Sequence, residues 1–144
     1  MKGKFIVFEG IDGSGKSAQL SLLKNSLKQK GYNIITTRDP GGTRIGGALR
    51  NILLNPVFDE FDPYAEALVY AASRAQLINQ AIIPAVESGK IVLCDRFIES
   101  SIAYQGYGRG IDLEYIYSIN KQSTSKIQPE LVFIFDIDYD TAIK

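Results

Sequence analysis

The stretch "FEGIDGSGKSAQL", from Phe8 to Leu20, decides the fold of this 144-residue chain. Gly10, Gly15, Lys16 and Ser17 match the pattern G-x-x-x-x-G-K-[ST]. An apolar run over 5–8 predicts a buried strand before the motif, and leucines at three- and four-residue spacing predict an amphipathic helix over 17–30 after it. This pattern binds phosphate groups when it lies between a strand and a helix, so the stretch predicts a phosphate-binding loop.

The chemistry of such a loop comes from backbone N–H groups and from the positive end of the following helix, which together surround phosphate oxygens. Lys16 is placed to reach the β- and γ-phosphates of a nucleotide, and Ser17 to ligate Mg²⁺. The predicted nucleotide-binding residues are Gly10, Ile11, Asp12, Gly13, Ser14, Gly15, Lys16 and Ser17. The alternative is a glycine-rich turn that matches by accident. The pattern assigns no role to Glu9.

Composition excludes several classes of function. Lys plus Arg equals Asp plus Glu at 16 each, so the chain lacks the basic excess of a nucleic-acid-binding protein. It has no histidine, which excludes Ser-His-Asp and Cys-His catalysis and His-ligated metals. Cys94 is the one cysteine, expected in a buried strand, and it fits a reducing compartment. No apolar run approaches the roughly 20 residues that span a membrane.

Strands and helices alternate along the sequence. Apolar runs predict further strands over 32–37, 91–94 and 131–135, and helices are predicted over 48–54, 63–80 and 113–120. Glycine and proline predict loops over 38–43 and 107–112, and Asp140 is a candidate N-cap of a last helix. Residues 120–123 are typical of a solvated helix end. The alternation predicts an α/β fold of one domain, with a parallel sheet covered by helices on both faces.

Charged residues follow every predicted strand. They are Glu9 after the first, Arg38 and Asp39 after the second, Asp95 and Arg96 after the third, and Asp136 and Asp138 after the fourth. Ligands of open parallel sheets bind at the carboxyl ends of the strands, so these residues predict a site for two phosphate groups. Asp95 and Asp136 are both candidates for the acid that steadies Mg²⁺, and the pattern does not choose between them.

The helix predicted over 63–80 has two faces of interest. Leu68, Ala72 and Ala75 are predicted to form its core stripe. Tyr70 and Arg74 lie roughly 40° apart on the helix, at about 100° per residue, and away from that stripe. An aromatic ring beside a guanidinium can stack on a nucleobase and donate hydrogen bonds to it, although a surface Tyr–Arg contact has the same spacing.

Five segments carry a family resemblance: "FEGIDGSGKS", "TRDPGGT", "LVYAASRAQ", "LCDRFIESSIAYQGYGRG" and "PELVFIFDID". In order and spacing they resemble the motifs of bacterial thymidylate kinases, and they cover essentially the whole chain. The resemblance implies a P-loop kinase fold with strand order 2-3-1-4-5. It also implies transfer of the γ-phosphoryl group of ATP, held with Mg²⁺, to dTMP to give dTDP, by a cytoplasmic homodimer.

The resemblance also implies roles for individual residues. Lys16, Asp12, Arg96 and Arg38 would be catalytic, and Ser17 and Asp95 would hold Mg²⁺. Arg96 and Arg38 would hold the acceptor phosphate with Asp39 orienting them, while Tyr70 stacks on thymine, Arg74 bonds its edge and Tyr104 crowds the 2′ position. The implied substrate-binding residues are Asp12, Arg38, Asp39, Arg50, Tyr70, Arg74, Arg96, Ser101, Tyr104 and Gln105.

The chain departs from the family pattern in three ways. Ala18 stands where threonine is usual, and Asp39 where glutamate is usual. The family pattern also places a mobile lid, a fifth strand and further helices beyond Lys144, so the single domain over 1–144 is expected to be incomplete at its C-terminus. The phosphate loop has no arginine at its variable positions, which places the expected catalytic arginine in that lid. The alternatives are a kinase for another small acceptor and a nucleotide-binding fragment with feeble catalysis.

Overall fold

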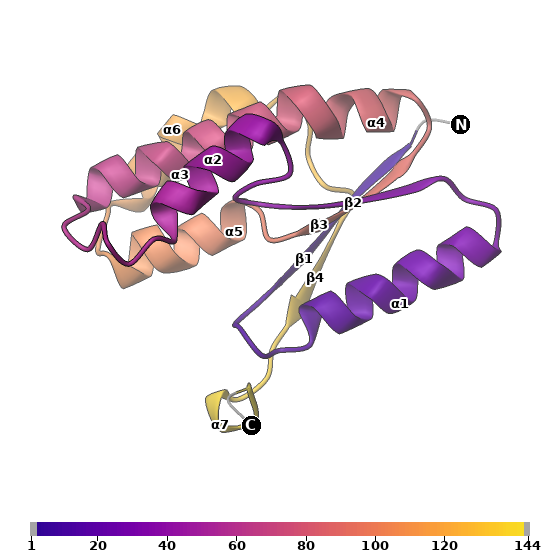
Figure 1. The fold of residues 1–144 in the computed structure, drawn as a ribbon, viewed down its shortest axis with the longest axis horizontal. Coiled ribbons are helices and arrows are strands. Elements are labelled where there is room, and N and C mark those ends of the chain that lie inside the picture. The colour runs from indigo at the N-terminus through magenta and orange to yellow at the C-terminus, as the bar shows by residue number, and fades with distance from the viewer. Residues whose placement is uncertain (1–2, 143–144) are drawn as a thin grey trace.

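The structure is a computed structural model that describes residues 3–142. Its centre is a four-stranded sheet of β1 (Lys4–Gly10), β2 (Ile34–Arg38), β3 (Ile91–Asp95) and β4 (Leu131–Phe135), shown in Figure 1. The strand order is β2-β3-β1-β4 and every neighbouring pair is parallel. The predicted α/β class is confirmed, and so is the relative order of the four strands that the resemblance implied.

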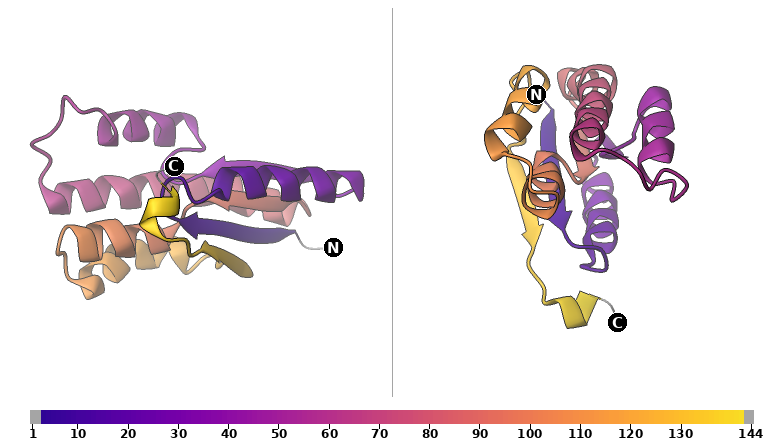
Figure 2. Two further views of the ribbon diagram at one scale, coloured as in Figure 1. Left: turned by 90° about the horizontal axis from the view of Figure 1, so that it is seen from below. Right: turned by 90° about the vertical axis from the view of Figure 1, so that its left-hand side faces the viewer.

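Helices connect the strands in the predicted alternation. They are α1 (Lys16–Gln29), α2 (Arg44–Leu53), α3 (Pro63–Leu77), α4 (Ile83–Glu87), α5 (Ile98–Ser101), α6 (Leu113–Thr124) and α7 (Tyr139–Ala142), with two π-helical turns, η1 (Ile78–Ile82) and η2 (Ile102–Gly108). The α7 turn follows β4 and stands away from the other helices (Figure 2). None of the helices within residues 3–142 has the length and apolar character needed to cross a lipid bilayer.

Strand alternation divides the core between the two faces of the sheet. Phe5, Val7, Val92 and Cys94 face one side, where they pack against α3, η1 and α4. The alternate residues of the same strands face α1 on the other side of the sheet, where Phe8 and Leu93 pack against Leu20 and Leu23. Cys94 is fully buried, as predicted, and burial raises the pKa of its thiol well above the usual value. The two layers hold the carboxyl ends of the strands at one open edge.

The predicted core stripe of α3 is wrong. Leu68 and Ala72 are exposed, whereas Ala67, Ala71 and Arg74 lie on the buried face. The buried face of α3 contains a charged residue, Arg74, so apolar spacing alone does not mark this face as the buried one.

Two other boundaries differ from the sequence prediction. The segment Ile98–Gly108 is helical through α5 and η2, although its glycines predicted no helix there. The last helical turn is capped by Asp138, whose carboxylate accepts hydrogen bonds from the backbone N–H and hydroxyl of Thr141 at 2.9 and 2.8 Å, and not by Asp140. A carboxylate three residues before the bonded N–H has the spacing of a cap, which Asp138 satisfies.

Gly42, in the loop after β2, provides a test of how this loop packs against β2 and α3. Its φ is +73°, and an added Cβ would lie 2.1 Å from Thr37 Oγ1 and 2.6 Å from Leu77 Cδ1. We expect Gly42→Ala to lower the free energy of unfolding by about 1–3 kcal/mol, because the backbone strain and the clash add together. Gly47→Ala is the matched control: a Cβ there meets nothing within 4 Å inside α2, and alanine should stabilise the helix by about 0.5–1 kcal/mol. Urea denaturation of both variants measures the difference, and equal midpoints would contradict the packing described here.

Candidate active site

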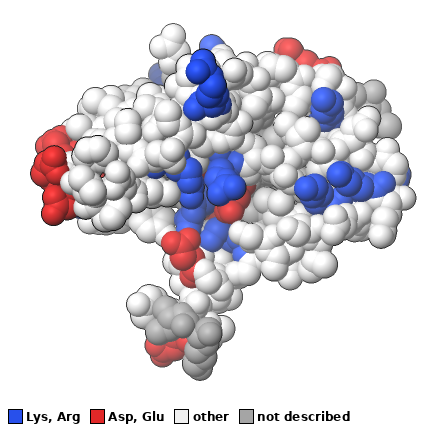
Figure 3. All heavy atoms as spheres, viewed as in Figure 1, with Lys and Arg blue, Asp and Glu red and all other residues white. Residues whose placement is uncertain are grey.

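Strand register brings charged residues of different strands to one edge of the sheet. Arg38 of β2 and Phe8 of β1 are both register partners of Asp95 at the end of β3. The backbone N–H of Arg96 then donates to Phe8 O at 2.9 Å, and that of Asp39 to Asp95 O at 3.0 Å. Figure 3 shows basic side chains gathered around the hollow at the centre of this face.

The loop between β1 and α1 has the backbone of a phosphate-binding loop. Gly10, Gly13 and Gly15 all have positive φ, at 149°, 80° and 85°, a region that favours glycine. The side chain of Lys16 is buried and folds back over the loop, where Nζ donates to Ile11 O at 2.7 Å and contacts Ser14 Oγ at 3.5 Å. Burial, reinforced by the charge of Arg96, lowers the pKa of this ammonium.

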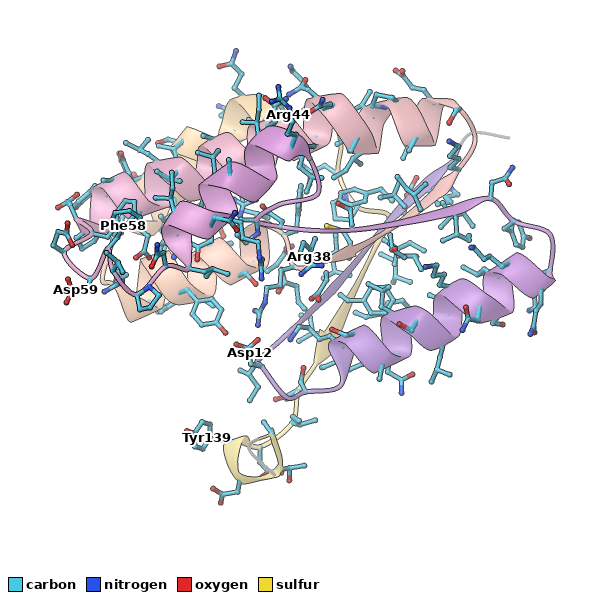
Figure 4. The ribbon with its side chains drawn as sticks, in the orientation of Figure 1. Asp12, Arg38, Arg44, Phe58, Asp59 and Tyr139 are labelled. Atoms are coloured by element: carbon cyan, nitrogen blue, oxygen red, sulfur yellow. The ribbon has the colours of Figure 1, made fainter. Side chains whose placement is uncertain are left out.

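A cavity of about 390 Å³ lies over this loop. Besides the loop and Ala18, its walls come from the ends of β2 and β3 and from α2; these wall residues are Arg38, Asp39, Arg50, Asp95 and Arg96. Asp12 and Arg38 both point into the space between α1 and the group of helices containing α2 and α3 (Figure 4). The cavity combines a helix N-terminus, a lysine and three arginines, which suits it to polyphosphate.

Ser17 and Asp95 lie together on one wall of this cavity. Ser17 Oγ donates to Asp95 Oδ2 at 3.3 Å. Asp95 Oδ1 is buried and has no hydrogen-bond partner among residues 3–142, an arrangement that favours a cation or a donor from a ligand. Asp136, the competing candidate, does not line the cavity.

A second cavity of about 270 Å³ adjoins the first. The two share four lining residues, Asp12, Asp39, Arg50 and Arg96. The remaining wall residues come from α3, from the segment Ile98–Gly108 and from the positions that follow β2 and α2. They are Pro40, Leu54, Tyr70, Arg74, Ser100, Ser101, Tyr104 and Gln105. All ten predicted substrate-binding residues therefore line one or both of these cavities.

Arg74 is 1% exposed and lies at the centre of a polar network beneath the second cavity. Its Nε donates to Asp39 Oδ2 at 2.5 Å, Nη1 to Asn120 Oδ1 at 2.6 Å, and Nη2 to Ser101 Oγ at 2.7 Å and Phe97 O at 3.3 Å. Its guanidinium also lies 5.6 Å from the centroid of the Phe97 ring. These contacts fix the guanidinium plane.

Asp39 has a different partner from the one that the resemblance implied. Its carboxylate pairs with Arg74, whereas it was expected to orient Arg38 and Arg96. The side chain turns away from β2 into the protein, where burial raises its pKa against the opposing effect of Arg74. Oδ1 has no hydrogen-bond partner among the described residues.

Arg96 joins the two cavities. Its backbone has φ +70°, unusual for a residue other than glycine. Nη2 donates to Asp12 Oδ1 at 2.6 Å, and the guanidinium lies 5.4 Å from the centroid of the Tyr104 ring. Burial lowers the pKa of Arg96, but the hydrogen bond and charge of Asp12 together with the interaction of Tyr104 outweigh it, so the pKa is raised and the side chain stays cationic.

Other positions were placed less well by sequence reasoning. Asn120 was expected at a solvated helix end, yet it is 1% exposed and bonded to Arg74. Gln105 is also buried and its amide donates to Glu66 Oε1 at 2.8 Å, which adds an unpredicted residue next to the pocket. Burial raises the pKa of Tyr70, which stays a neutral phenol on the cavity wall.

Comparison with known proteins agrees with this geometry. The sequence model of the thymidylate kinase family matches residues 8–144. The chain is 55% identical to the thymidylate kinase of Pelotomaculum thermopropionicum over 96% of its own length and 64% of that protein. It is also 55% identical to the thymidylate kinase of an Exiguobacterium species over 99% of its length and 67% of that protein.

A solved structure gives the same result. The crystal structure of thymidylate kinase from Ehrlichia chaffeensis superposes with a TM-score of 0.89 at 40% identity, covering 99% of this chain and 81% of the other. The chain thus spans about two thirds of the length of the curated relatives it matches. With the family match across nearly all of its residues, the chain belongs to the thymidylate kinase family.

Proposed function

We propose that this protein transfers the γ-phosphoryl group of ATP to dTMP, giving dTDP and ADP. The observation that carries the proposal is the junction of the two cavities at shared residues. A phosphate-loop cavity and a second, partly aromatic pocket meet at Arg96, Arg50 and Asp12, so an acceptor held in one has its phosphate next to the donor held in the other. The family membership supports the same donor and acceptor.

The donor side is served by the phosphate loop. Loop N–H groups and Lys16 bind the β- and γ-phosphates, with the N-terminus of α1 adding its partial positive charge. The residues fit Mg²⁺: Ser17 and the unpartnered Oδ1 of Asp95 are oxygen ligands of the kind this ion prefers. Among the described residues no three acidic or thiol groups gather at one point, so bound phosphates would complete the shell. When bound, the ion neutralises charge that develops on the transferring group.

The acceptor side is served by the second cavity. At its junction with the first cavity, Arg50 and Arg96, joined by Arg38 from the first cavity, hold the phosphate of dTMP, and Asp12 lies near the sugar 3′-hydroxyl. Tyr70 stacks on thymine, and Ser101 and Gln105 bond its edge. A guanidinium has five N–H donors, and the network of Arg74 uses four, which leaves one on Nη1 for the base. Tyr104, on the same wall, restricts the 2′ position.

The transfer itself needs positioning more than proton removal. An oxygen of the acceptor phosphate is already an anion; it forms a bond to the γ-phosphorus while the bond to the β,γ-bridging oxygen breaks, and ADP leaves with the electron pair. No histidine or other strong base is required. The task is to bring two polyanions together in line, which arginines and a lysine perform electrostatically.

The test is a coupled ADP-release assay with dTMP, dUMP, dCMP, AMP and GMP as acceptors. We expect the highest kcat/KM for dTMP. Buried hydrogen-bond donors and acceptors of the pocket are left unpaired by the wrong base edge, so we expect kcat/KM for dCMP to be at least about 10²-fold lower. A ribonucleotide preferred over dTMP would reject the proposal in favour of another acceptor. Calorimetric titration with dTMP, run in parallel, separates absent binding from slow transfer.

Two further features belong to the proposal. The protein acts as a homodimer in the cytoplasm, as the family resemblance implies. Sedimentation velocity of the purified protein, with and without dTMP, measures its mass in solution.

A further inference from the structure

Glu9 is a buried acid beside the site that the proposed mechanism does not use. It lies at the end of β1, next to Gly10 of the phosphate loop, and is 5% exposed. Its carboxylate accepts three hydrogen bonds, all from the turn that follows β3. Oε1 accepts from the backbone N–H of Phe97 at 2.6 Å and of Ser100 at 3.3 Å, and Oε2 from Ser100 Oγ at 2.7 Å.

The Ser100 hydroxyl connects this acid to Arg96. A hydroxyl has one hydrogen to donate and two lone pairs to accept with. Because Ser100 gives its hydrogen to Glu9, its oxygen is left as an acceptor, and Arg96 Nη1 donates to it at 3.1 Å. The other side of the guanidinium is bonded to Asp12 of the phosphate loop at 2.6 Å. Arg96 is therefore held between two acceptors whose positions depend on β1 and its loop.

The backbone of the same turn also depends on Glu9. Arg96 has a left-handed conformation at φ +70°, which is strained for a residue with a side chain and persists only where neighbours enforce it. The Phe97 N–H, the first after Arg96, donates to Glu9, and the Arg96 N–H donates to Phe8 O at 2.9 Å. Two adjacent residues of β1 thus hold the strained residue from one side.

We propose that Glu9 is a positioning residue that fixes Arg96 for the acceptor phosphate, through the Ser100 hydroxyl and the Phe97 amide. The inference rests on the proposed function for its effect on dTMP. It assigns a role in the reaction to the acid of the opening motif. It also makes the end of β1 the common support of both substrates: Gly10 begins the donor loop, and Glu9 sets the arginine that faces the acceptor.

The test combines Glu9→Gln with Ser100→Ala. Glutamine keeps the size of Glu9 but presents an N–H donor to the Ser100 hydroxyl, which must turn its own hydrogen away, and it removes the negative charge near Arg96. We expect each variant to lower kcat/KM for dTMP about tenfold, since small misplacements of a binding group cost 10–100-fold, while ATP affinity changes less than about twofold. Ser100→Thr, which keeps the hydroxyl, should retain most of the activity.

A double-mutant cycle tests whether Glu9 acts on Arg96 through Ser100. If Glu9 acts through Ser100, the double variant should lose about tenfold, as each single variant does; independent effects would multiply to about a hundredfold. Glu99→Gln is the matched control, an acid two positions from Phe97 whose Oε2 has no hydrogen-bond partner among the described residues, and it should leave kcat/KM unchanged. Multiplicative losses, or equal losses for ATP and dTMP, would overturn the positioning role.

The outcome can be separated from a failure of the proposed function. If the wild-type protein neither binds nor phosphorylates dTMP, the proposed function is wrong, and the crystal structure of Glu9→Gln then decides the structural part of the inference. We expect Arg96 to leave its bond to Ser100 or its positive φ in that variant. An unchanged Arg96 would overturn the inference whatever the substrate. Where Glu9→Gln does not fold, the structure of Ser100→Ala replaces it for the guanidinium contact.

Discussion

Replacing Arg74 by leucine is expected to destabilise the protein by about 3–5 kcal/mol, a large part of the 5–15 kcal/mol that typically separates folded from unfolded domains. The guanidinium is 1% exposed and donates to Asp39, Asn120, Ser101 and Phe97 O. Leucine fills similar volume but leaves the Asp39 carboxylate buried without its cation. The cost of an unpaired buried charge exceeds the gain from added apolar surface.

Urea denaturation followed by circular dichroism measures this loss. Arg109→Leu is the matched control, because Arg109 also pairs with an acid, Glu66, at 2.7 Å, but its side chain is half exposed. An exposed pair contributes little, so this control should unfold near the wild-type midpoint. Equal shifts for the two variants would contradict the burial argument.

A second substitution locates the source of the loss. The double variant Arg74→Leu, Asp39→Leu removes both charges, and it should recover part of the stability that Arg74→Leu loses. If the double variant is less stable than the single one, the lost free energy lies in the Asn120 and Ser101 bonds and not in the unpaired carboxylate.

Arg74 also shows why the position of a site residue could be predicted from the sequence, whereas the residues that hold it in place could not. The resemblance implied that Arg74 bonds the edge of thymine, and the structure shows Arg74 in the wall of the second cavity. The partners that hold Arg74 come from the loop after β2, from α5 and the residue before it, and from α6, which no local sequence pattern connects. Asn120 has the composition of a solvated helix end, and its burial follows from how α6 packs on α3.

The sheet was predictable for a physical reason. Apolar and β-branched residues gather in short runs between turn residues, and the four predicted strands match β1, β2, β3 and β4 within two residues at each end. The segment Ile98–Gly108 was not predicted, because its glycines oppose a helix when taken alone. Glu9, from a distant part of the chain, accepts hydrogen bonds from the N–H groups of Phe97 and Ser100 at the start of this segment, and Gly106 fits against Leu113 near its end.

The largest effect on the reaction is expected from Lys16→Met. Lys16 Nζ is buried at the floor of the phosphate-loop cavity, where its charge is weakly screened. Removing a single preorganised group that stabilises developing charge lowers kcat by about 10²–10³-fold, and we expect a loss of that size. Methionine keeps the length and the apolar stem, so the loop retains its packing while the charge is lost.

The distribution of the loss between kcat and KM distinguishes two roles for Lys16. If Lys16 stabilises the transferring phosphoryl group more than bound ATP, kcat falls while the KM for ATP rises only slightly. If Lys16 only closes the loop through its bonds to Ile11 and Ser14, ATP affinity falls first and kcat at saturation recovers. Lys28→Met removes an exposed lysine of α1 and controls for net charge. A Lys16→Met variant that turns over dTMP within a few-fold of the Lys28→Met control would show that the buried ammonium does not act on the phosphates.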